Sequence, residues 1–127
     1  MNDDNVRHLP RLAIGEAAHL FGMTHRAIRF YEEKGLIEAR RDRLNCRFYD
    51  GAARRRLGWI SALRAAQVPL AEIEEVLEAE DRDGRGRACA IGKLQARRAE
   101  IQMDLAKVDL ALAKLEPGET RPKAAER

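Results

Sequence analysis

The positively charged side chains between residues 24 and 63 give the strongest chemical signal in this 127-residue sequence. Arginine and lysine bind the phosphates of a polyanion through charge and hydrogen bonds. Residues 72–83 reverse the sign, so the polyanion is expected to contact the first half of the chain and not to wrap the whole of it. The ten basic residues of 24–63 are Arg26, Arg29, Lys34, Arg40, Arg41, Arg43, Arg47, Arg54, Arg55 and Arg56, against the acids Glu32, Glu33, Glu38, Asp42 and Asp50.

Catalytic chemistry is not indicated by the remaining polar residues. The sequence shows no nucleophile paired with a base, no glycine loop that would cradle a phosphate and no carboxylate pair in a plausible pocket, so we expect no enzyme. Cys46 and Cys89 are isolated, and one thiolate does not make a closed site for a soft metal. We therefore expect no cofactor and no metal, with Cys89 as the single candidate ligand.

Two short helices joined by a tight turn are expected to position the first of these basic residues. Segment 13–22, "AIGEAAHLFG", carries apolar residues at helical spacing, and Gly22 is placed to end that helix. Thr24 is a candidate N-cap for a second helix that runs from His25 to about Glu33. Its apolar side is Ala27, Ile28 and Tyr31, and its outer side is His25, Arg26, Arg29, Phe30 and Glu33. This pattern predicts a helix-turn-helix whose second helix presents a basic face to a groove.

The segment after Ile37 is expected to form a two-stranded wing. Turn-forming Asp42 and Asn45 lie between arginines, and "CRFYD" alternates as a strand does. Such a wing would place Arg40, Arg41, Arg43 and Arg47 along a phosphate backbone. A helix is then predicted from Gly51 to the Pro69 break, and another from Leu70, followed by a linker at "DRDGRGR", residues 81–87.

The last predicted helix carries a heptad pattern. Apolar residues recur in steps of three and four, with Arg98 as the single charged exception. The preceding domain is too small to cover so long an apolar stripe, so a second copy of the chain is the expected partner. This heptad seam consists of Ile91, Leu94, Ile101, Leu105, Val108, Leu112 and Leu115.

Taken in order, these parts resemble the MerR family of bacterial transcription regulators, in a short form without an appended effector domain. The matching stretches are "IGEAAHLFGMTHRAIRFYEEKGLI", "CRFYD", "LAEIEEVL" and the terminal helix, and they extend from about Leu12 to Leu115. The fold class implied is mainly α: a winged helix-turn-helix DNA-binding domain followed by a long C-terminal coiled-coil dimerisation helix.

The resemblance implies a homodimer that binds a near-palindromic promoter element between widely spaced polymerase recognition boxes. The dimer would bend and untwist that DNA, and so act on RNA polymerase indirectly. By position in the family, Arg29 and Phe30 of the second helix and Arg47 and Tyr49 of the wing would contact DNA. The exposed faces add His25, Arg26, Arg40, Arg41 and, from the arginine run 54–56, Arg55.

Four segments are expected from this reading. They are a flexible leader at 1–10, the DNA-binding domain at 11–83, a linker with an antiparallel coiled-coil helix at 84–116 and a disordered tail at 117–127. No apolar run reaches the length of a membrane span, and the acidic N-terminus is unlike a secretory signal, so a cytoplasmic, nucleoid-associated protein is expected. A different class stays open: an interaction protein that uses the coil, with the basic domain as a non-specific DNA anchor.

Overall fold

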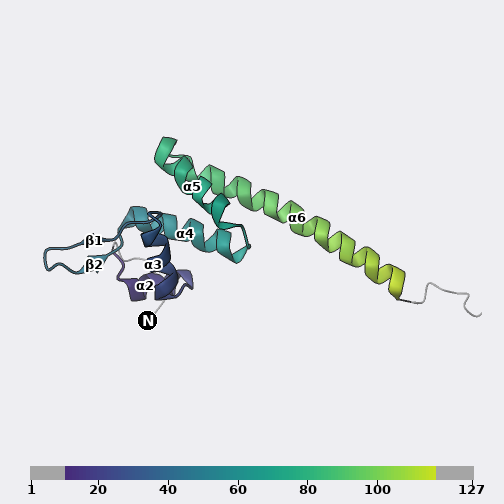
Figure 1. Ribbon diagram of the computed structural model, residues 1–127, viewed down its shortest axis with the longest axis horizontal. Helices are drawn as coiled ribbons and strands as arrows, with labels where there is room; N and C mark the ends of the chain where they lie inside the picture. The colour runs from purple at the N-terminus through teal and green to yellow at the C-terminus, as the bar shows by residue number, and fades with distance from the viewer. Residues whose placement is uncertain (1–10, 117–127) are drawn as a thin grey trace, which may run out of the picture. The chain divides into compact units, whose positions relative to one another are not determined.

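The computed structural model describes residues 11–116, and these are mainly helical, as predicted (Figure 1). The leader predicted at 1–10 and the tail predicted at 117–127 lie outside the described residues. Contacts divide the chain into two compact units, Met1–Leu94 and Gln95–Arg127, called here the first and the second unit. The elements in order are α2 (Ile14–Phe21), α3 (His25–Glu33), β1 (Arg40–Arg41), β2 (Arg47–Phe48), α4 (Gly51–Ala65), α5 (Leu70–Asp83) and α6 (Gly86–Leu115).

The turn between α2 and α3 is built by the residues that the sequence indicated. Gly22 ends α2 in a left-handed conformation with φ +61°, which glycine adopts without steric cost. The Thr24 hydroxyl accepts the backbone N–H of Ala27 at 3.0 Å and so caps α3. Gly35, with φ +79°, turns the chain away after the helix. The predicted helix-turn-helix is therefore confirmed at these boundaries.

A single apolar core holds α2 and α3 against α4 and α5. Ile28 and Tyr31 fill it from α3, and Ile37 returns to it after the turn. The Ser61 hydroxyl of α4 donates to the Phe21 carbonyl at 2.9 Å, which ties α4 to the end of α2. The core fixes which side of α3 stays outside. Its largest fully buried side chains are Leu12, Ile28, Tyr49, Leu57, Ile60, Leu63, Ile73, Val76 and Leu77.

The predicted wing is present as a short antiparallel hairpin. Arg40 pairs with Phe48, and Arg41 pairs with Arg47. The Asp42 carboxylate accepts the backbone N–H groups of Leu44 and Cys46, each at 2.9 Å, and so closes the loop through the side chain. The hairpin is further anchored by Tyr49, whose backbone exchanges hydrogen bonds with Leu12 of 2.7 and 3.0 Å.

The linker predicted at residues 81–87 is wrong, because this segment is almost entirely helical. Helix α5 continues to Asp83, and α6 begins at Gly86. Gly84, with φ +73°, ends α5, and the N–H of Arg85 returns to the Ala79 carbonyl at 3.3 Å. The Glu80 carboxylate accepts the N–H of Gly86 at 3.1 Å. The two glycines therefore allow a sharp turn between helices and do not form a flexible spacer.

Gly86 allows the start of α6 to lie against α4, and a side chain there is expected to destabilise the first unit. A Cβ atom would lie 2.7 Å from Cζ3 of Trp59 and 2.8 Å from Cβ of Glu80. We expect Gly86→Ala to lower the free energy of unfolding by about 1–3 kcal/mol, as overpacking does. Urea unfolding followed by circular dichroism at fixed protein concentration measures this loss.

Gly92→Ala is the matched control for this prediction. Gly92 is also in α6, but apart from its chain neighbours and the backbone of its own helix no atom lies within 4 Å of its Cβ position. Alanine in a helix is better than glycine by roughly 0.5–1 kcal/mol, so this variant should be as stable as the parent or more stable. Equal gains from both substitutions would contradict the overpacking argument.

The described part of the second unit, residues 95–116, is almost entirely the remainder of α6, and its large apolar side chains are exposed in a single chain. The seam residues Ile101, Leu105, Val108, Leu112 and Leu115 are 45–81% exposed. Leu94, expected in the same seam, instead packs partly against the core of the first unit. Among residues 11–116, no helix combines the length and the apolar character that crossing a membrane requires.

Candidate nucleic-acid interface

The outer face of α3 is basic and carries one exposed aromatic ring. His25, Arg26, Arg29 and Phe30 are all exposed, as the sequence predicted from the helical period. The Phe30 ring meets the edge of buried Tyr31, with centroids 5.3 Å apart and planes at 75°. This packing fixes the direction of Phe30. A helix of this kind fits the major groove of double-stranded DNA, which admits an α-helix.

Two further cations lie at the aromatic end of this face. The Lys34 ammonium is 5.8 Å from the centre of the Phe30 ring, and the Arg64 guanidinium is 5.9 Å from the centre of the Tyr31 ring. Arg64 comes from α4 and was not singled out from the sequence. No sequence motif in α4 marks Arg64 as a functional residue. Only the fold brings this residue close to α3.

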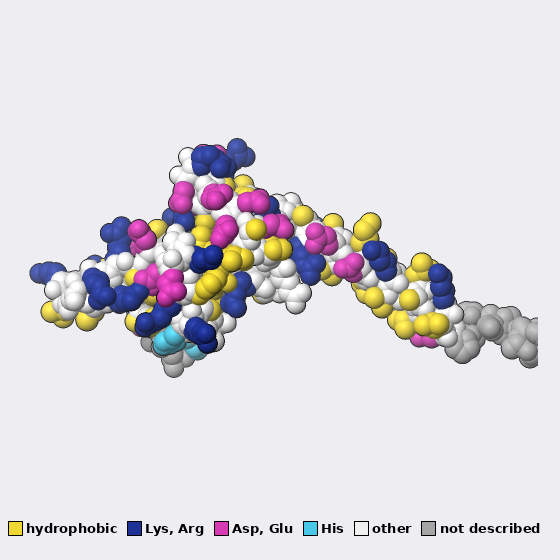
Figure 2. Space-filling model, in the orientation of Figure 1, with side chains coloured by type: hydrophobic (Ala, Val, Ile, Leu, Met, Phe, Trp, Pro, Cys, Tyr) yellow, Lys and Arg dark blue, Asp and Glu magenta, His cyan; other side chains and the backbone are white. Residues whose placement is uncertain are grey.

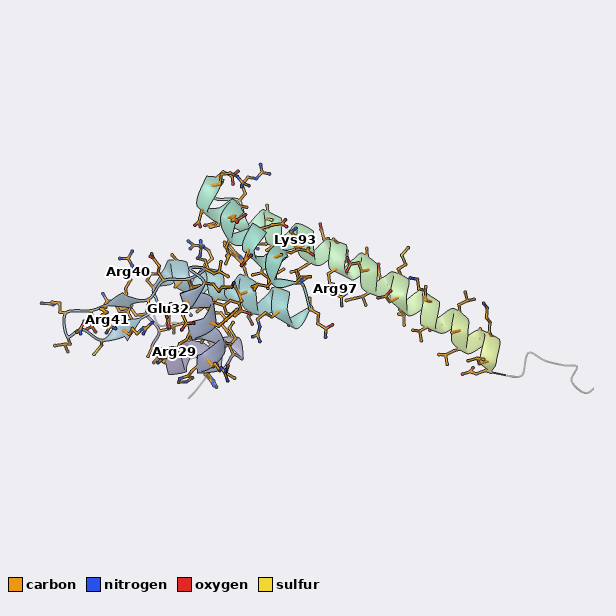
Figure 3. The ribbon with its side chains drawn as sticks, in the orientation of Figure 1. Arg29, Glu32, Arg40, Arg41, Lys93 and Arg97 are labelled. Carbon is orange, nitrogen blue, oxygen red and sulfur yellow. The ribbon has the colours of Figure 1, made fainter. Side chains whose placement is uncertain are left out.

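Glu32 lies on the side of α3 that faces the wing (Figure 3). Its carboxylate forms an ion pair with the guanidinium of Arg47 in β2 and accepts the hydroxyl of Tyr49 at 3.0 Å. The Tyr49 side chain was expected to contact DNA, but the residue is only 1% exposed. Its ring belongs to the core, so its position favours an internal role. Neither contact of Glu32 was expected from the sequence, because 15 and 17 residues separate the partners.

Burial of Tyr49 and its hydrogen bond to Glu32 together raise the pKa of the Tyr49 hydroxyl to about 12. Since the folded protein favours the neutral phenol, this stabilisation is complete below about pH 10 and is lost as the pH rises towards 12. We expect the free energy of unfolding to fall across this window, and to fall less in Tyr49→Phe. Urea unfolding at pH 9 and at about pH 11.5 compares the two proteins. Parallel losses would contradict the assignment.

Two arginines of the wing already form hydrogen bonds within the protein. Arg40 is bonded to Asp50 at 2.8 Å, and Arg41 donates to the Asn45 carbonyl at 2.9 Å, although both remain exposed. The N–H of Ala53 and, to a lesser extent, Arg40 lower the pKa of Asp50, which keeps this carboxylate charged. Asp50 therefore neutralises part of the charge of Arg40.

An open hollow on one face of the wing brings in a residue that the sequence analysis missed. Its lining is Arg11, Arg41, Asp42, Arg43, Leu44 and Phe48. The Arg11 guanidinium stacks over the Phe48 ring at 4.5 Å from the centroid, which orients it beside the wing. Only the charge of Arg11 could have indicated it, because its partner lies in a distant strand. The hollow suits a phosphate backbone that passes along the wing.

The arginine run at 54–56 contains a structural residue. Arg56 donates to the Leu36 carbonyl at 2.7 Å and to the Asp81 carboxylate at 3.0 Å, and its side chain is only 15% exposed. It therefore ties α4 to the segment after α3 and to α5. Arg55 is exposed and stays a candidate for phosphate contact.

Acidic side chains predominate along α5, whereas basic side chains predominate around α3 and the wing. Figure 2 shows blue side chains around the wing and α3, with some magenta among them, and magenta side chains along α5, with blue at its end. In the acidic part, Lys93 of α6 bonds Glu75 at 2.6 Å and lies 3.6 Å from Glu72. Its pKa is raised, chiefly by the hydrogen bond to Glu75. Lys93 is therefore paired with acidic side chains of α5 and lies apart from the basic side chains of α3 and the wing.

Both cysteines are free thiols, and they are far apart in the sequence. Cys46 is exposed in the wing, and Cys89 is half-buried against the core. Within residues 11–116 no three potential ligands among histidine, cysteine, aspartate and glutamate lie close enough together to hold a metal ion.

Comparison with known proteins matches residues 12–80 to the family described as MerR HTH family regulatory protein. Among solved structures, the chain is similar to the HTH-type transcriptional regulator SkgA from Caulobacter crescentus. The two are 28% identical, with a TM-score of 0.62, over 90% of this chain and 84% of that one.

Two other structures share the fold. The regulator PbrR691 from Ralstonia metallidurans CH34, solved in complex with lead(II), is 29% identical over 82% of each chain, with a TM-score of 0.56. HiNmlR, a regulator lacking the sensor domain and solved bound to promoter DNA, is 17% identical over 81% of this chain and 79% of that one. Its TM-score of 0.62 shows a common fold.

Proposed function

Because the chain belongs to the MerR family of helix-turn-helix regulatory proteins, we propose that it binds promoter DNA as a homodimer and distorts that DNA to control transcription. The family consists of DNA-binding transcription regulators, which are not enzymes. With promoter DNA as its proposed partner, the protein would act at the bacterial chromosome, in the cytoplasm.

The observation that carries the proposal is the exposed basic face of α3 beside a basic wing. We propose that α3 enters the major groove, where His25, Arg26 and Arg29 reach base edges and phosphates and Phe30 makes an apolar contact. From the wing, Arg40, Arg41 and Arg47 would bind phosphates, together with Arg55 of α4. Phosphate contacts fix the position of a protein on DNA, whereas contacts to base edges specify the sequence.

The homodimer is supported by the uncovered seam of the second unit. Large aliphatic side chains repeat there in steps of three and four, and a partner helix would cover them. We propose an antiparallel pair of α6 helices, with residues 11–83 as the DNA-binding domain and 84–116 as the dimerisation segment. Two copies related by a twofold axis would read a near-palindromic element.

Distortion of the promoter is the proposed regulatory act. A dimer that grips phosphates on both sides of a site can hold DNA in a bent and untwisted form, so that polymerase engages two widely spaced recognition boxes. Polymerase would then respond to the shape of the DNA and not to a contact with the protein. HiNmlR, which shares the fold, was solved bound to promoter DNA.

The decisive experiment compares binding of the full chain to the DNA upstream of its own gene and to a scrambled duplex. Fluorescence anisotropy at near-physiological salt should show a preference on the order of a thousandfold, as specific regulators do. Analytical ultracentrifugation of the same sample gives the oligomeric state. Equal, weak and steeply salt-dependent binding to both duplexes would instead favour an interaction protein with a non-specific DNA anchor.

A further inference from the structure

Glu32 is an acidic residue inside the proposed DNA-binding surface. It lies one turn after Arg29 on α3 and faces the strand that carries Arg47. By charge alone, a carboxylate in this position opposes the approach of a phosphate backbone. We therefore expect Glu32 to make a contribution that offsets this unfavourable charge.

The contacts of Glu32 connect α3 to the wing at two points. One carboxylate oxygen, Oε1, accepts the Tyr49 hydroxyl at 3.0 Å, and the other, Oε2, accepts the Arg47 guanidinium. Tyr49 is itself held by two backbone hydrogen bonds to Leu12 at the start of the helix-turn-helix. The Glu32 side chain is only 20% exposed, so the bonds lie in a partly shielded environment.

We propose that Glu32 is a positioning residue, which aims the Arg47 guanidinium at a DNA phosphate and holds the wing in register with α3. This inference rests on the proposed function. A free arginine side chain loses rotamer freedom when it binds, and a residue already held by a carboxylate loses less. The guanidinium has five N–H donors, so the bond to Glu32 leaves donors for a phosphate.

The test is a substitution for which charge and positioning predict opposite results. Glu32→Gln removes a negative charge from the surface, so charge alone predicts tighter binding. If Glu32 positions Arg47, the variant loses the charge-assisted bond and binds the promoter duplex about tenfold more weakly. Fluorescence anisotropy on the specific duplex measures the change.

Glu33→Gln is the matched control, because it makes the same change of charge at the next residue of α3. Glu33 is exposed and faces away from the core. We expect this variant to bind DNA as well as the parent does, or more tightly. Circular dichroism and thermal unfolding of both variants check that they are folded.

Three further measurements separate positioning from a merely structural role. If Glu32 acts chiefly through Arg47, then Glu32→Gln should weaken binding much less in an Arg47→Ala background than in the parent. Tyr49→Phe, which keeps every charge, should weaken binding a few-fold, because it removes the bond that holds Glu32. The pKa of Tyr49, followed by ultraviolet absorbance, should fall from about 12 towards the ordinary value in folded Glu32→Gln.

Failure of this inference is distinguishable from failure of the proposed function. A parent protein that does not discriminate the promoter duplex from the scrambled one would overturn the proposed function. A parent that discriminates, with Glu32→Gln binding as tightly as Glu33→Gln, would overturn the role of Glu32 alone. An equal effect of Glu32→Gln with and without Arg47 would also overturn it.

Discussion

Replacing Leu105 with aspartate is expected to convert the protein to monomers and to weaken promoter binding by about a hundredfold or more. Leu105 lies in the middle of the heptad seam. It is 57% exposed in one chain, as expected of a residue that a second chain would cover. In the proposed dimer an aspartate there would be buried without a counter-ion. A monomer binds only one half-site, so it loses the affinity that a dimer gains by binding two half-sites at once. Analytical ultracentrifugation and fluorescence anisotropy measure the two effects.

Met103→Asp is the control for that substitution. Met103 is a large apolar residue of the same helix and is 64% exposed. Two residues of α-helix correspond to a rotation of about 200°, so Met103 lies nearly opposite Leu105 and outside the seam. We expect this variant to stay dimeric and to bind the promoter normally. Dissociation by both variants would mean that the pairing surface is not the seam.

Replacing Arg29 with alanine is expected to weaken binding to the promoter duplex by about 10- to 100-fold, with little effect on the scrambled duplex. Arg29 is exposed in the middle of α3, where a guanidinium can reach the edge of a guanine and form two hydrogen bonds. Losing such a contact removes discrimination, whereas losing a phosphate contact weakens binding to every sequence. Anisotropy on both duplexes at several salt concentrations distinguishes these outcomes.

Arg87→Ala is the matched control for Arg29→Ala. It removes the same charge from an exposed position in the first turn of α6, outside the basic segment. It should leave both affinities nearly unchanged, and the dimer should persist in both variants. An equal loss on the two duplexes for Arg29→Ala would assign this residue to phosphate contact, and the base contact would have to come from another part of α3.

Sequence reasoning predicted the elements whose signals are local. The caps and the period of α3 lie within a dozen residues, so its start at His25 and its exposed residues followed from the sequence. The two-stranded wing also followed, because Asp42 and Asn45 mark its turn. The predicted linker at 81–87 is wrong because glycine and charge do not by themselves indicate a flexible segment. Arginine is a good helix former, and here Gly84 ends one helix while Gly86 lies at the start of the next.

Features that depend on distant partners could not be predicted. Nothing around Tyr49 shows that its ring enters the core or that its hydroxyl meets Glu32. Arg56 stood in a run of three arginines as a possible phosphate ligand, and only the fold reveals its bonds to Leu36 and Asp81. The alternation of a two-residue strand does not indicate which of its side chains face the core and which face the solvent. The charge of an arginine run does not indicate this either. The bonds that a polar side chain forms within the protein decide whether that side chain is available to contact DNA.

The close approach of Gly86 to Trp59 also provides the protein with an intrinsic optical probe. Trp59 is the only tryptophan in the chain, so its fluorescence reports on one place in the molecule. Its half-buried ring lies between α4 and the beginning of α6. Any ligand or DNA that shifts the first turn of α6 would change the hydration of the indole and therefore its emission maximum. Conformational coupling at this junction can thus be followed in the unlabelled protein.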